Sequence, residues 1–188
     1  FADYHLRLEF KWGEARYAPR LDQPRNNGLL YHSHGEPGAV FGTWARSVEF
    51  EILTGSTGMV VRGGDEVEAK TRAGFDDTII SPHVRYMPDG AAVTVTGETW
   101  NAETHADVEK PIGEWNVLDL WVLGDHAVHA VNGVPVMEVW DLCDIEEDGG
   151  PCLPLTSGRI QLQSEGADVY FRNITLEPIA ALPKIVAN

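Results

Sequence analysis

Apolar and polar residues alternate with a period of two along most of this chain. In residues 6–10 and 47–52, an apolar side chain occupies every second position and a charged or polar one lies between. Because successive side chains of a strand point to opposite faces, this pattern predicts strands with one buried and one polar face. No stretch shows a convincing apolar period of 3.6 residues, so we expect no substantial helix.

Turn signals connect further strands in the second half. Residues 115–123, 126–131 and 134–140 form a predicted meander, joined by Gly124-Asp125 and by Asn132-Gly133. The second turn is a strong type I′ hairpin signal, because both central residues need a positive φ. We also expect strands at 28–34 and 92–96, whereas residues 55–111 are otherwise the least regular part of the chain. Many short strands with hairpin turns predict an all-β sandwich or jelly roll of two antiparallel sheets.

A closing β-hairpin is expected over residues 159–177, with a bulge near Arg172-Asn173, where the parity of its apolar positions changes. Its first strand alternates apolar residues with long polar ones, namely Arg159, Gln161, Gln163 and Glu165. Such a row is suited to sugar hydroxyls, because each hydroxyl both donates and accepts hydrogen bonds. An ordinary solvated sheet face is the alternative interpretation.

Length and charge narrow the classes of partner. The 188 residues indicate one domain, which we place at residues 1–177 with a C-terminal extension at 178–188. Since the alternation begins at once, we expect a leader, and perhaps a first strand, to precede Phe1. The formal net charge of −15 argues against nucleic acid and anionic membranes as partners. No apolar run approaches the roughly 20 residues of a membrane span, so we expect no membrane insertion.

The chain has two cysteines, Cys143 and Cys152, which flank an acidic, glycine-rich loop. A short loop between two such residues, with no other thiol in the chain, fits one disulfide in an oxidising compartment. Two unrelated free thiols are the alternative.

Two carboxylates are the first candidates for catalysis. Glu49 and Glu51 lie two apart on one predicted strand, so both side chains leave the same face, roughly 6 to 7 Å apart at the backbone. Their carboxyl groups could reach the roughly 5 to 5.5 Å spacing of a retaining glycosidase. Two exposed glutamates on a polar face are the alternative.

His32, His34 and Trp100 are weaker candidates. Two histidines at positions i and i+2 can chelate a divalent metal ion if a carboxylate approaches, and Glu49 on the next strand could supply it. Otherwise the histidines are structural. Trp100 is the best sugar-stacking platform, because it lies among polar residues in the irregular region. We expect most of the other tryptophans in the core.

Six segments, taken in order, resemble the 3-keto-disaccharide hydrolase domain family. They are residues 4–12, 26–32, 44–52, 113–116, 131–133 and 158–174. The resemblance implies a concanavalin-like (lectin- or laminarinase-like) jelly roll. It also implies an exported bacterial protein, periplasmic or extracellular, that acts on an oxidised glycoside or oligosaccharide. The family strand that matches residues 46–52 typically reads Glu-x-Gln-Ile, whereas this chain has Glu51 in place of the glutamine.

The implied reaction begins at a sugar whose C3 is a ketone. The ketone acidifies the C2 proton, a general base removes that proton, the C1 substituent leaves, and water then adds. We expect Glu49 to be the base and His32, with or without a divalent metal ion, to polarise the carbonyl. The residues expected to hold the ring and tune the base are Arg7, Glu9, Glu51, Gln161, Gln163 and Glu165. The alternatives are a retaining glycoside hydrolase using Glu49 and Glu51 and a non-catalytic, lectin-like carbohydrate-binding module.

Overall fold

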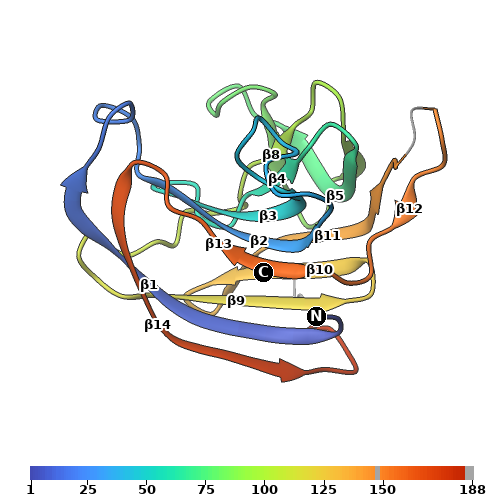
Figure 1. Cartoon of the computed structure of the whole chain (residues 1–188). Coiled ribbons are helices and arrows are strands. Elements are labelled where there is room, and N and C mark those ends of the chain that lie inside the picture. The colour runs from blue at the N-terminus through green and yellow to red at the C-terminus, as the bar shows by residue number, and fades with distance from the viewer. Residues whose placement is uncertain (147–148, 185–188) are drawn as a thin grey trace.

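The computed structural model describes residues 1–146 and 149–184, and in these two ranges every regular element is a strand. The strands are β1 (Tyr4–Arg16), β2 (Asn26–His34), β3 (Arg46–Leu53), β4 (Val60–Gly63), β5 (Val67–Phe75), β6 (Val84–Tyr86), β7 (Ala91–Val95), β8 (Asn101–Ala102), β9 (Asn116–Leu123), β10 (His126–Val131), β11 (Val134–Asp144), β12 (Leu153–Pro154), β13 (Arg159–Leu162) and β14 (Ala167–Pro178). They form two stacked antiparallel sheets (Figure 1). The predicted all-β jelly roll is confirmed.

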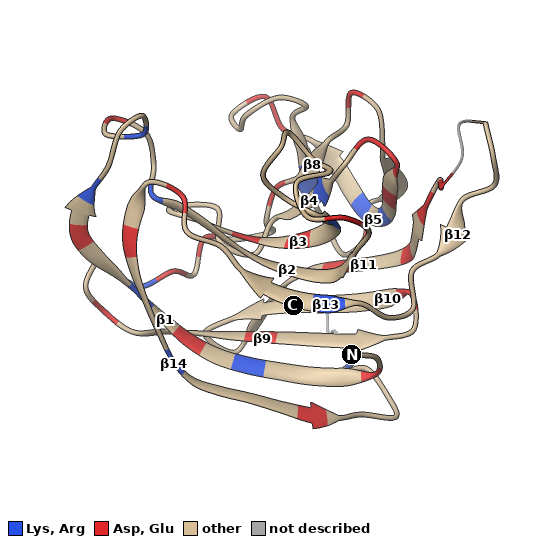
Figure 2. Ribbon diagram, viewed as in Figure 1, with Lys and Arg blue, Asp and Glu red and all other residues tan. Residues whose placement is uncertain are grey.

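The two sheets differ in size. In the described part of the chain, the larger sheet has the strand order β14-β1-β9-β10-β11-β5-β6, with β12 beside β11 and β7 beside β5. The smaller sheet has the order β13-β2-β3-β4-β8 and lies over the larger one in Figure 1. Acidic residues are spread over both sheets and the loops rather than gathered on one face (Figure 2). The net negative charge therefore does not mark one binding surface.

The core lies between the facing sides of the two sheets. Alternate residues of β1, from Tyr4 to Trp12, are buried there, and Val48, Phe50 and Ile52 of β3 meet them from the smaller sheet. The expectation for the tryptophans was wrong. Trp12 is buried in this core, whereas the other five are at least partly exposed. Trp121 and Trp140 lie on the outer face of the larger sheet, and Trp44, Trp100 and Trp115 lie in the segments between strands.

Two local predictions are confirmed. Asn132 and Gly133 adopt φ values of 52° and 82°, as a type I′ turn between β10 and β11 requires. The pairing of β1 with β14 shifts between Arg7, opposite Thr175, and Glu9, opposite Arg172. Asn173 and Ile174 of β14 thus lie opposite the single Leu8 of β1, and this one extra residue makes the predicted bulge.

The predicted closing hairpin is wrong. β13 pairs with β2 in the smaller sheet, whereas β14 pairs with β1 in the larger one. The residues between them cross from one sheet to the other, and alternation alone cannot show which sheet a strand joins. The irregular region also contains β5, which the sequence pattern missed because its inward positions are small side chains such as Ala69, Thr71 and Ala73.

Cys143 and Cys152 form a disulfide, with an S–S length of 2.02 Å and Cα atoms 5.4 Å apart. This confirms the predicted pairing, which is typical of an oxidising compartment and consistent with an exported protein. The bond fastens the end of β11 beside β12. Across residues 1–146 and 149–184, no helix has the length and apolar character needed to cross a bilayer.

Candidate functional site

A cavity of about 670 Å³ opens on the outer face of the smaller sheet. Its size is typical of sites for small molecules. The residues that line it include Arg20, Asn26, Leu30, Val40, Phe41, Trp44, Glu49, Glu51, Val61, Arg62, Ile80, Trp100, Gln163 and Glu165. The cavity thus brings together loops and strands from distant parts of the sequence.

Glu49 and Glu51 form the floor of the cavity on β3, the central strand of the smaller sheet. Alternation buries Phe50, which lies between them, on the core side and turns both carboxyl groups outward. Gly28 on β2 lies opposite Glu51. A Cβ atom at Gly28 would lie 1.8 Å from Oε1 of Glu49 and 3.1 Å from Cδ of Gln163. The glycine therefore gives the Glu49 carboxyl its space, next to the amide of Gln163.

The two carboxyl groups are buried and close to each other. Glu49 is 9% exposed and Glu51 is 5% exposed. Burial raises the pKa of Glu51 to about 7, while a hydrogen bond with Glu49 and the nearby Asn26 and Arg20 act in the opposite direction. Burial also raises the pKa of Glu49 well above its usual range, and the charge of Glu51 raises it further. The pair therefore holds a shared proton close to neutral pH.

A polar wall stands beside the carboxyl pair. The guanidinium of Arg20 donates from Nη1 to Oε1 of Glu165, and the amide of Gln163 donates to the other carboxylate oxygen at 3.2 Å. The loop between β1 and β2, which carries Arg20, is fastened by a backbone hydrogen bond of 2.9 Å from Tyr17 to Gly166. These contacts hold the guanidinium of Arg20 and the side-chain amide of Gln163 at the edge of the cavity.

Several buried polar atoms of the carboxyl pair and the residues around it have no hydrogen-bond partner among the described residues. Oε1 of Glu49, Oε1 of Gln163 and Oδ1 of Asn26 are buried, and no group in the described residues donates to them. Nε of Arg20 is likewise a buried donor that none of those residues accepts from. Since buried polar groups are nearly always hydrogen-bonded, the cluster suits a ligand that both donates and accepts.

The sequence as a whole identifies the family. Residues 1–177 match the model of the 3-keto-alpha-glucoside-1,2-lyase-like domain. The chain belongs to this family. The resemblance to 3-keto-disaccharide hydrolases is thereby confirmed, and the matched residues include both carboxylates and the whole polar wall.

Two solved structures share the fold of this family member. A candidate glycosyl hydrolase from Parabacteroides distasonis superposes with a TM-score of 0.55 at 16% identity, over 96% of this chain and 73% of that one. A second candidate glycosyl hydrolase from that organism gives 0.50 at 20% identity, over 95% and 79%. The carbohydrate-binding module CBM66 from Bacillus subtilis gives 0.47 at 10% identity, over 94% and 76%. No curated protein sequence matches the chain.

The cavity brings together five of the residues that the sequence singled out: Glu49, Glu51, Gln163, Glu165 and Trp100. Gln161 lies on the same face, opposite Leu30, but outside the cavity, where it accepts a hydrogen bond of 2.5 Å from Ser33. Sequence reasoning missed Arg20, Asn26 and Gly28. Only Gly28 carried a signal, because a glycine inside a strand often marks a close approach.

Arg7 and Glu9 lie elsewhere, which corrects their expected part in sugar binding. Both are on β1 of the larger sheet, where Arg7 binds Asp119 at 3.0 Å and Glu9 accepts from Arg172 at 2.7 Å. Alternation placed them correctly on a polar outer face. That face belongs to the other sheet, on the opposite side of the sandwich from the cavity.

His32 also lies outside the cavity, although it was expected to polarise the substrate. Its φ of 49° falls where the pairing of β2 with β3 becomes irregular, so the alternation that would align it with Leu30 is broken. The side chain is 1% exposed and donates from Nε2 to the carbonyl of Gly124 at 3.0 Å. Burial lowers its pKa to about 4. His32 is therefore a buried structural residue.

The expected metal ligands do not fit a metal ion. Besides His32, the set included Glu49, in the cavity, and His34, whose ring nitrogens contact Asp144 at 2.6 Å and the carbonyl of His32 at 2.8 Å. The structure thus does not bring the three together, and we derive no step through a metal.

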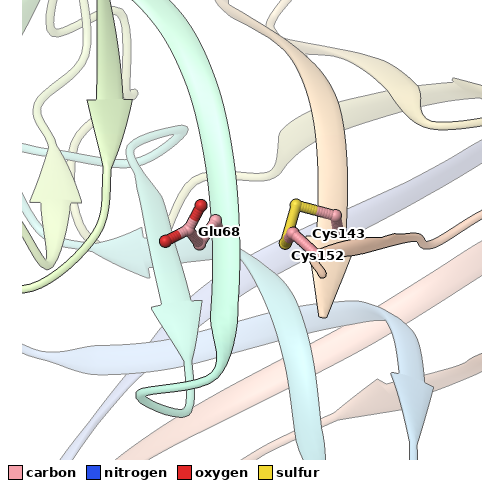
Figure 3. Close-up of side chains that lie close together, drawn as sticks. All are labelled: Glu68, Cys143 and Cys152. Carbon is pink, nitrogen blue, oxygen red and sulfur yellow. A yellow bond between two sulfur atoms is a disulfide. The ribbon is translucent and has the colours of Figure 1, made fainter. Parts of the chain in front are cut away.

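A different cluster lies beside the disulfide, where Glu68 approaches Cys143 and Cys152 (Figure 3). Both sulfur atoms are bonded to each other, so neither is a thiolate ligand, and Glu68 accepts a hydrogen bond of 2.7 Å from Thr96.

Proposed function

We propose that this chain is a carbohydrate-active enzyme that cleaves the anomeric bond of 3-keto-glycosides, including 3-keto-disaccharides. Membership of the 3-keto-alpha-glucoside-1,2-lyase-like family supports a carbohydrate ligand. The observation that carries the proposal is the buried Oε1 of Glu49 on the floor of the cavity, which has no hydrogen-bond partner within residues 1–146 and 149–184. It is a basic atom in a site that a sugar ring can fill.

The reaction is an elimination. Glu49 accepts the C2 proton, and the electrons of the C–H bond pass into the enolate of the C3 ketone. They then form the double bond between C1 and C2 as the bond from C1 to the leaving oxygen breaks, and that oxygen takes the proton from the Glu49 carboxyl, which returns to its basic form. Water then adds across the double bond and gives the free 3-keto sugar. A general base contributes roughly 10²- to 10⁴-fold to such a step.

The neighbours of Glu49 suit this role. The charge of Glu51 strengthens the base, because it raises the affinity of Glu49 for a proton. Charge develops on the C3 oxygen as the C2 proton leaves, so a donor there stabilises the transition state. We assign this role to Arg20, which lines the cavity and has an unpartnered buried Nε among the described residues. Arg20 thus replaces His32 as the polarising group.

A retaining glycosidase mechanism is less well supported. In that mechanism two carboxyl groups about 5 to 5.5 Å apart flank the anomeric carbon. Here Glu49 and Glu51 project from the same face of one strand, close enough for each to shift the pKa of the other. The two groups therefore face the cavity as one unit rather than from two sides of a scissile bond.

The test compares Glu49→Gln with Glu51→Gln on a 3-keto-glucoside and on its unoxidised parent. Glu49→Gln keeps its shape but not its basicity, so we expect sugar binding to survive while turnover falls roughly 10²- to 10⁴-fold. Glu51→Gln restores the residue typical of the family and should cost much less. Equal, severe losses together with hydrolysis of the parent glycoside would favour the retaining mechanism. Binding with no turnover by wild type would leave a carbohydrate-binding module.

A further inference from the structure

Polar and apolar residues line different sides of the cavity across the smaller sheet. Polar groups, among them Asn26 and Gln163, lie on the side of β2 and β13, and the carboxyl pair occupies β3 in the middle. On the other side lie Val61 of β4 and Trp100, which directly precedes β8. The loop between β2 and β3 adds the side chains of Phe41 and Trp44.

Phe41 is unusually placed for an aromatic residue. Its side chain is 88% exposed, and its φ of 50° lies in the left-handed region that non-glycine residues rarely adopt. A closed turn holds it there, because Val40 and Trp44 exchange backbone hydrogen bonds of 2.9 and 3.0 Å. The Trp44 ring meets Phe41 edge-on, with ring centres 6.4 Å apart. A strained, exposed aromatic side chain at a cavity is a feature of ligand-binding sites.

Trp100, from another segment of the chain, lines the same end of the cavity as Phe41 and Trp44. It is 40% exposed, and its carbonyl accepts a hydrogen bond of 3.2 Å from the backbone of Arg62 on β4. The guanidinium of Arg62 is already engaged, since it donates to the carbonyls of Gly64 and Gly97 and to the carboxylate of Asp65. This end therefore offers aromatic faces, with Glu66 the remaining carboxylate at the edge. The terminal nitrogens of its main cation, Arg62, are occupied, and its Nε is a buried donor that has no partner among the described residues.

We propose that this apolar end, defined by Phe41, Trp44 and Trp100, is the subsite for the departing group, and that it selects a flat aromatic aglycone. This inference rests on the proposed function. If the polar side binds the ring hydroxyls and Glu49 faces C2, the C1 substituent extends toward the apolar side. A second sugar can also stack there, but its hydroxyls find few partners among these side chains, so an aryl ring, which packs its whole face against them, binds more tightly.

The binding test uses phenyl and methyl glucosides, each as both anomers, which differ only in the aglycone. Isothermal titration or ligand-observed NMR should show that wild type binds the phenyl compound about tenfold more tightly or better, because each aromatic contact is worth roughly three- to tenfold. Phe41→Ala and Trp100→Ala should each weaken binding of the phenyl compound by about this factor more than they weaken binding of the methyl compound. Phe75→Ala is the matched control, since Phe75 is 75% exposed but lies outside the cavity.

The turnover test compares the phenyl and methyl forms of the 3-keto-glucoside. Phenol is a better leaving group than methanol whether or not the subsite selects it. The informative quantity is therefore the ratio of kcat/KM for the phenyl compound to kcat/KM for the methyl compound, compared between wild type and Phe41→Ala. We expect that ratio to fall about three- to tenfold. Failure of wild type to bind phenyl glucosides, equal binding of both compounds, or a preference that both variants retain would overturn the inference. An aryl preference without turnover of any 3-keto-glycoside would instead reject the proposed function alone.

Discussion

Replacement of Glu51 by glutamine should stabilise the protein, but only where the wild-type carboxyl would be ionised. The folded protein raises the pKa of Glu51 from 4.5 to about 7, mainly by burial. Below the unfolded value, both states are protonated and the group has no effect. As the pH rises from 4.5 to 7, the unfolded chain loses this proton first, so wild type loses stability.

The magnitude follows from the size of the shift. A difference of about 2.5 pKa units corresponds to about 3 kcal/mol of unfolding free energy at pH 8. Glutamine has nearly the same shape and does not ionise. For a chain of this length, Glu51→Gln should therefore raise Tm by roughly 6 to 12 °C at pH 8 and change it little at pH 4.5. Glu51→Gln also removes the Glu51 charge that raises the pKa of Glu49. This second effect stabilises the folded protein as well.

The assay is thermal unfolding by circular dichroism at pH 4.5, 6 and 8, with Glu14→Gln as an exposed control that also loses one carboxylate. The quantity compared is the difference in Tm between variant and wild type at each pH. A stabilisation that is equal at all three pH values would refute a raised pKa for this group. So would a Glu51→Gln protein that is less stable than wild type at pH 8.

Three further outcomes are expected. Turnover of a 3-keto-glucoside should rise with pH along a limb that lies well above the usual range of a glutamate, because Glu49 must be deprotonated to act as the base, and Glu51→Gln should move that limb to lower pH; a rate that falls over this range would contradict the assignment. Gly28→Ala should lower kcat/KM at least tenfold with an unchanged far-ultraviolet spectrum, because the new methyl group would displace the carboxyl of Glu49. Titration of the unreduced, denatured protein should detect no free thiol, and reduction of Cys143–Cys152 should cost about 2 to 3 kcal/mol of stability.

Alternation in the sequence was enough to predict strands but not to assign them to sheets. The pattern correctly placed Glu49 and Glu9 on polar outer faces, yet only the pairing of strands shows that these faces lie on opposite sides of the sandwich. The type I′ turn was predictable because its requirement for positive φ is local. His32 was misplaced because the irregularity in β2 that turns its side chain has no clear signature in the sequence.

The pairing of Arg20 with Glu165 illustrates the part of the site that no local pattern contains. Glu165 belongs to the predicted polar row, but Arg20 lies in a loop and has no neighbour in sequence that indicates the cavity. Their pairing depends on how two distant segments are brought together by both sheets. The carboxyl pair on one strand, by contrast, was visible because alternation fixes a shared face for residues two apart.

The ion pair between Arg20 and Glu165 joins residues that are 145 positions apart in the chain. Loop closure over such a span has a high entropic cost, so contacts of this kind form late relative to local turns. Strands such as β9, β10 and β11, which are linked by short turns, can pair before the two ends of the chain have met. The polar wall of the cavity is thus complete only when the last long-range contacts form. During refolding, recovery of sugar binding therefore reports the completed sandwich, whereas recovery of strand content does not.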